Sequence, residues 1–129
     1  MTEEKLISSI SLENDLLISF YDESKKIAGD RWQVVLKAII QIVTDQVQFP
    51  KMDPEKRLEI LQVVGKQIDY EKKLVRNFID EKEKEKIIKE LYESFLQITR
   101  PYFSHGQFAE RFVLKNYADS LEKRKWVNS

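Results

Sequence analysis

The chain has 129 residues and a mass of 15.4 kDa, which is long enough to build one hydrophobic core without disulfide bonds. Its 22 Lys and Arg residues balance its 22 Asp and Glu residues, so no net charge draws it to nucleic acid or anionic lipid. The absence of cysteine excludes disulfides, thiolate metal sites and cysteine nucleophiles. We predict a single domain over residues 1–129, located in the cytoplasm, with no signal peptide or membrane span.

The N-terminal ~45 residues alternate apolar and polar side chains, as strands of an antiparallel sheet do. One apolar row begins at Leu6 and a second begins at Leu16. Glu13, Asn14 and Asp15 separate the two rows, and Asn and Asp favour turns because they tolerate left-handed dihedrals and bond to their own backbone. This pattern predicts a β-meander.

The clearest strand signal lies between Arg31 and Val43, directly after the turn residues 28–30. Every even-numbered residue in this segment is apolar, namely Trp32, Val34, Leu36, Ala38, Ile40 and Ile42. A helical spacing also fits some of these residues, but the many branched Val and Ile side chains favour a strand. We therefore predict a long central strand with Trp32, Leu36 and Ile40 facing inward.

Helix signals follow in the second half of the chain. Asp53 and Pro54 form a typical helix start, and Gly65 is a typical stop. Residues 67–78 are ambiguous, because their apolar side chains fit either an edge strand or a continuation of the helix past Gly65. Both interpretations remain open from the sequence.

Two further helices are predicted from capping boxes. Asp80 with Glu83 begins a helix that ends at Arg100 and Pro101. Its apolar stripe consists of Ile87, Ile88, Leu91, Tyr92, Phe95 and Ile98. Ser104 with Gln107 is expected to begin the last helix. The fold class that follows is α+β, an N-terminal antiparallel β-meander with two or three helices packed on one face, and the alternative is an all-α bundle.

No catalytic constellation is visible in the sequence. His105 is the only histidine, and no second ligand stands at a metal-binding spacing from it. With only three glycines, the chain has neither a phosphate-binding loop nor a dinucleotide fingerprint. We therefore predict no catalytic residues, no metal and no cofactor.

The candidate binding residues are Asp30, Arg31 and Arg76. Turns beside a rigid scaffold often carry binding sites, and a guanidinium binds carboxylate or phosphate through two parallel hydrogen bonds. Arg76 lies near Arg31 only if residues 67–78 pair with the sheet.

These features favour a non-enzymatic binding or adaptor module, whose partner is another protein or a second copy of the chain. The alternative is a small ligand-sensing domain or an enzyme with its site near the turn Gly29–Trp32. Nucleic acid is not favoured as a partner, because the basic run at residues 123–125 belongs to no wider basic face.

Overall fold

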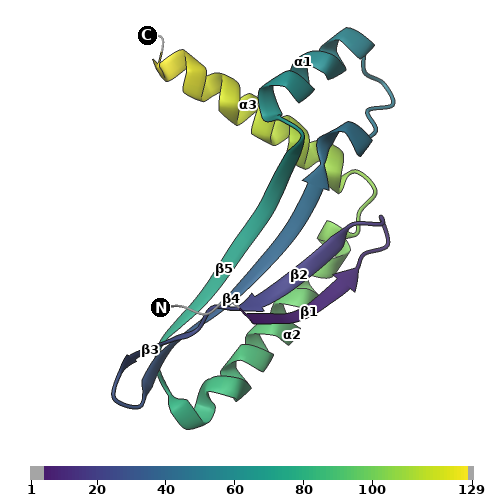
Figure 1. Cartoon of the computed structure of the whole chain (residues 1–129). Coiled ribbons are helices and arrows are strands. Elements are labelled where there is room, and N and C mark those ends of the chain that lie inside the picture. Colours follow the sequence, from purple (N-terminus) through teal and green to yellow (C-terminus); the bar gives the residue numbers. More distant parts are fainter. Residues whose placement is uncertain (1–4, 128–129) are drawn as a thin grey trace.

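A computed structural model describes residues 5–127 and shows an antiparallel sheet combined with three helices (Figure 1). The strands are β1 (Lys5–Ser11), β2 (Leu17–Asp22), β3 (Lys25–Ala28), β4 (Arg31–Val43) and β5 (Gln67–Asp80). The helices are α1 (Pro54–Val64), α2 (Lys84–Phe103) and α3 (Phe108–Val127), with short 3-10 turns η1 (Thr44–Gln46) and η2 (Glu81–Glu83). The predicted α+β class is confirmed, and the all-α alternative is wrong.

β4 is the central strand of the sheet. One of its edges pairs with β5 along its whole length, from Arg31 opposite Asp80 to Val43 opposite Gln67. Its other edge pairs with β2 over residues 36–40 and with β3 over residues 31–33. The ambiguous segment after Gly65 is therefore a strand, because it bonds to β4 throughout.

The predicted meander is confirmed, since β1 pairs with β2 and β2 pairs with β4, each antiparallel; β3 is an additional short strand. β2 and β3 do not lie side by side but follow one another along the same edge of β4. Between them, the Asp22 carboxylate accepts the N–H of Ser24 at 2.9 Å, and the Ser24 hydroxyl accepts the N–H of Val35 at 3.0 Å. The N–H of Glu23 still donates to the Val35 carbonyl at 3.0 Å, so the Ser24 hydroxyl replaces only one backbone partner of β4 at the break between β2 and β3.

α2 covers one face of the sheet. The even-numbered residues of β4 form the core with Ile88, Leu91 and Phe95 of this helix. Phe20 of β2 meets the ring of Phe95 at a centroid distance of 6.1 Å. The inward row is as predicted for Leu36 and Ile40, which are fully buried, whereas Trp32 is only partly buried.

α1 and α3 pack together at the end of the long β4–β5 pair, beyond β1 and β2 (Figure 1). The Tyr117 hydroxyl of α3 donates to the Glu59 carboxylate of α1 at 2.7 Å. Tyr70 of β5 lies among the rings of Phe103, Phe108 and Phe112. α2 therefore lies along the face, while α1 and α3 pack against the same core at the end of the sheet.

Two predicted helix boundaries need correction. The Ser104–Gln107 capping box does not form, because the Ser104 hydroxyl is buried without a hydrogen-bond partner and His105 Nδ1 accepts the N–H of Gln107 instead. α2 also continues past Pro101 to Phe103. Pro101 has no N–H to donate to the Gln97 carbonyl, so the last turn of α2 lacks one helical hydrogen bond, and the helix ends two residues later.

Phe78 is a strained residue at a β-bulge. It has φ of 57°, a left-handed conformation that a bulky residue rarely adopts. The register of β5 shifts against β4 here, between Ile79 opposite Trp32 and Arg76 opposite Val34, and the Phe78 side chain is 73% exposed. β5 therefore contains one extra residue relative to β4, and such a bulge bends the sheet near the C-terminal end of β5.

Truncation of Phe95 tests the core. Phe95 is 9% exposed and contacts the rings of Phe20 and Phe103. We expect Phe95→Ala to lower the free energy of unfolding by about 3–5 kcal/mol in urea denaturation, because it leaves a cavity between the sheet and α2. The control Lys86→Ala, at an exposed position of the same helix, should change it by less than about 0.5 kcal/mol. Equal losses in both variants would contradict this packing.

Candidate functional site

The face of the sheet opposite α2 carries the odd-numbered side chains of β2 and β4. Successive side chains of a strand point to opposite faces, so burial of the even row against α2 directs the odd row the other way. Tyr21 and Ile39 are half-buried on this second face, and Gln41 is exposed. We call it the open face.

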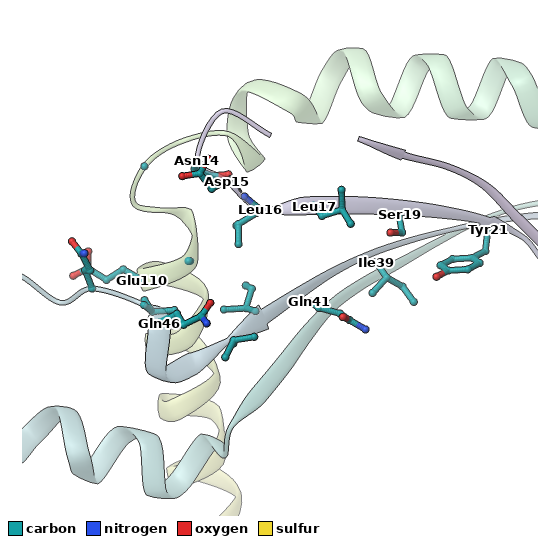
Figure 2. Close-up of a pocket in the computed structure, with 16 residues that line it drawn as sticks. Asn14, Asp15, Leu16, Leu17, Ser19, Tyr21, Ile39, Gln41, Gln46 and Glu110 are labelled. Atoms are coloured by element: carbon teal, nitrogen blue, oxygen red, sulfur yellow. Dashed lines mark hydrogen bonds between the residues drawn. The ribbon is translucent and has the colours of Figure 1, made fainter. Parts of the chain in front are cut away.

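A groove of about 760 Å³ lies on the open face near the end of β4 (Figure 2). Side chains of β2 and β4 form one part of its wall, and the first turn of α3 forms another. The sixteen lining residues are Asn14, Asp15, Leu16, Leu17, Ser19, Tyr21, Ile39, Gln41, Ile42, Val43, Gln46, Val47, Gln48, Gly106, Ala109 and Glu110.

Asn14 fixes the β1–β2 turn at one border of the groove. Its amide nitrogen donates to the carbonyl oxygens of Phe103 at 2.7 Å and His105 at 3.1 Å, just where α2 ends. Its side-chain oxygen accepts the N–H of Leu16 at 3.2 Å. Asn14 thus satisfies the Phe103 carbonyl at the end of α2, adds a second bond to the His105 carbonyl, which also accepts the N–H of Phe108 at 3.0 Å, and fixes the turn against α2.

Beside this turn, one edge of β4 has no described strand partner. The pairing of β2 with β4 stops at Ile18 opposite Ile40. Residues 41–43 of β4 therefore pair with β5 on one edge but with no described strand on the other. The groove combines accessible side chains with unpaired backbone groups, which is the combination that an added extended segment uses.

The lining combines apolar, amide and acidic side chains. Leu17 and Val43 are 48% and 41% exposed, which is high for aliphatic residues of a sheet. Gln41 and the exposed Gln46 supply hydrogen-bond donors and acceptors that can turn toward a ligand. The charged side chains that line it, Asp15 and Glu110, are both acidic.

A charged cluster lies next to the groove on the same face. Lys37 and Lys73 are directly opposite each other across β4 and β5, and the Glu23 carboxylate lies between them. Its oxygens are 3.4 Å from the Lys37 ammonium and 3.2 Å from the Lys73 ammonium. Lys37 is only 8% exposed and also lies over the ring of Tyr21. Glu23 therefore offsets the repulsion between two lysines that would otherwise destabilise the strand pair.

Burial alone would raise the pKa of Glu23, but hydrogen bonds and charges from Lys73 and Lys37 outweigh it, and the pKa falls below its usual value of 4.5. A lowered pKa means that the ionised carboxylate stabilises the fold above this value and that the stabilisation disappears as the pH falls through the folded-state pKa.

We therefore expect Glu23→Gln to lower the free energy of unfolding at about pH 7 and to approach the wild-type value as the pH falls through the lowered folded-state pKa, where the wild-type carboxylate becomes protonated. Urea titrations across this range measure the difference. Glu85→Gln is the control, since that side chain is 82% exposed. If the Gln variant kept the full wild-type pH dependence, Glu23 would not be the group that is responsible.

The structure places the predicted residues Asp30 and Arg31 at the β3–β4 turn, outside the groove. The Arg31 guanidinium lies 3.3 Å from the Asp80 carboxylate and 3.8 Å from that of Asp30. Arg31 thus binds carboxylates of its own chain. A role for these residues in binding a partner stays a prediction.

Arg76 does lie in the strand that pairs with the sheet, opposite Val34. Since Val34 belongs to the even row of β4 and Arg31 to the odd row, the two arginines project from opposite faces. The structure therefore does not bring Arg31 and Arg76 together into one site. Trp32, the other end of the predicted turn, lies beneath the Lys84 ammonium, which is 3.9 Å from its ring centroid.

Sequence reasoning missed the groove. Apart from Ile42, its strand residues lie on the less apolar row of β4 and β2, which the alternation pattern treats as solvent-facing. Asn14 and Asp15 were identified only as turn residues, and Asp15 does have a left-handed φ of 69°. The unpaired end of β4 also marks the groove, but it depends on strand register. The sequence does not reveal that register.

Comparison with protein-family models, with curated proteins and with solved structures finds no match to this chain. No helix between residues 5 and 127 is long and apolar enough to cross a membrane. Within the same residues, no three His, Cys, Asp or Glu side chains are grouped so that they could hold a metal ion.

Proposed function

We propose that the protein is a non-enzymatic interaction module that binds a short extended segment of a partner protein in the groove of the open face. The observation that carries this proposal is the unpaired end of β4 beside exposed aliphatic side chains. An extended segment next to residues 41–43 satisfies backbone groups that have no strand partner in the described chain.

The side chains of the groove indicate what such a segment contains. Leu17, Ile39 and Val43 offer apolar contacts, and burial of their exposed surface supplies the favourable free energy of binding. The glutamine side chains at the rim adapt their donors and acceptors to a peptide backbone. A volume of about 760 Å³ is adequate for several residues of a peptide and lies within the usual range for binding sites.

The charge of the groove favours a basic residue in the partner. Asp15 and Glu110 make no ion pair with any residue that the structure describes. A Lys or Arg side chain of the partner gains charge-assisted hydrogen bonds with these carboxylates. An acidic segment is repelled, so the same two residues also supply specificity.

Selection of peptides from a displayed random library tests this function. We expect wild-type protein to enrich peptides that combine aliphatic residues with Lys or Arg. The double variant Leu17→Thr/Val43→Thr should bind an enriched, fluorescently labelled peptide at least about tenfold more weakly in anisotropy titrations, because it removes the apolar contact. Asp15→Asn/Glu110→Gln should weaken binding of the basic peptides in a salt-dependent way.

Val75→Thr is the matched control, since Val75 is also exposed on the sheet, at 38%, but lies outside the groove. The control should bind like the wild type. Failure to enrich any peptide, or equal affinity of the groove variants and the control, would reject the groove as the binding site.

A further inference from the structure

β5 has an outer edge that no described strand covers. This strand runs for 14 residues and pairs only with β4. An unpaired edge of that length presents a row of backbone N–H and C=O groups that can template a further strand. The edge is separate from the groove, to which β5 contributes no residue.

An apolar surface adjoins this edge on the side of α2. Tyr70 and Leu74 of β5 face the helix and are only half-buried. On α2, Ile98 is 73% and Tyr102 is 60% exposed, and these two residues are one helical turn apart on the same side. We call these four residues the edge shelf.

Ring contacts connect the two parts of the shelf. Tyr102 packs on Phe103 at a centroid distance of 5.4 Å, and Phe103 packs on Tyr70 at 4.8 Å. Burial raises the pKa of Tyr70, and the nearby Tyr102 hydroxyl raises it further. After the short turn η2, α2 runs back antiparallel to β5 (Figure 1). The step from Tyr102 to Ile98 along α2 therefore follows the same direction as the step from Tyr70 to Leu74 along β5.

Two cations flank Leu74 on the same row. Lys72 and Arg76 are exposed, and neither forms an ion pair with any other residue between 5 and 127. The Arg76 guanidinium donates to the backbone carbonyl of Val75. Opposite charges on facing strands stabilise a pair, and like charges destabilise it.

The same charges disfavour a second copy of this chain as the occupant. In an antiparallel two-fold pairing of β5 with itself, a register centred on Leu74 places Lys72 opposite Arg76 twice. A register centred on Lys73 places that lysine opposite its own copy. Both central registers bring cations together, whereas an acidic strand meets them favourably.

We propose that the outer edge of β5 accepts an extended segment of a partner protein as an additional strand, and that this segment alternates apolar and acidic residues along the side facing α2. Its apolar residues lie on the edge shelf, and its carboxylates lie opposite Lys72 and Arg76. Its backbone continues the sheet beyond β5. With a basic segment in the groove and an acidic one at the edge, the module has two surfaces that select different partners.

The peptide VTETVTET, acetylated, amidated and labelled with fluorescein, is the probe, because it presents Val and Glu alternately on one face. We expect this peptide to bind wild-type protein in anisotropy titrations. The otherwise identical peptide with Lys in place of Glu should bind the protein at least tenfold more weakly. Lys72→Glu/Arg76→Glu should reverse this preference. Ile98→Ser/Tyr102→Ser should weaken binding of both peptides, since it removes the exposed part of the shelf.

Lys115→Glu/Lys123→Glu is the matched control, because it reverses two exposed charges on α3 and should leave the preference unchanged. Hydrogen exchange locates the bound peptide: amides of β5 should become protected, and those of residues 41–43 should not. The proposal is overturned if neither peptide binds up to about 1 mM, if the charge reversal leaves the preference as it is, or if protection appears in the groove.

Discussion

The pairing of β4 on both of its edges is the constraint on which the rest of the structure depends. The side chains of a strand alternate between its two faces, so the even row of β4 lies on one face, and pairing with β2 and β3 on one edge and with β5 on the other fixes this orientation. That row is almost entirely aliphatic, so α2 covers it and the core forms there. Since α2 occupies this face, the odd row lies on the open face. β5 is an edge strand because it pairs only with β4 among the described strands.

Asn14 fixes one border of the groove. By bonding to the carbonyls at the end of α2, it holds the β1–β2 turn against the helix rather than against β4. Residues 41–43 of β4, beside this turn, have no described strand neighbour on that edge. The groove and the outer edge of β5 thus share one feature. At each place, backbone pairing ends while side chains of the sheet remain accessible.

The sequence predicted the parts of the fold that depend on local periodicity. The alternation from Arg31 to Val43 identified the central strand, and the stripe through Phe95 identified the helix that covers it. It did not predict that β2 and β3 share an edge, because strand order depends on long-range pairing and on two side-chain bonds near Ser24. The groove was missed for the same reason, since no local pattern reveals where pairing between distant strands stops.

Amide hydrogen exchange measured by NMR tests the central position of β4 most directly. Residues 36–40 bond to β2 on one edge and to β5 on the other, so consecutive amides there should all exchange slowly. In β5, by contrast, protection should alternate, because every second N–H points to the free edge. Alternating protection within residues 36–40, or continuous protection along β5 in the free monomer, would contradict the account.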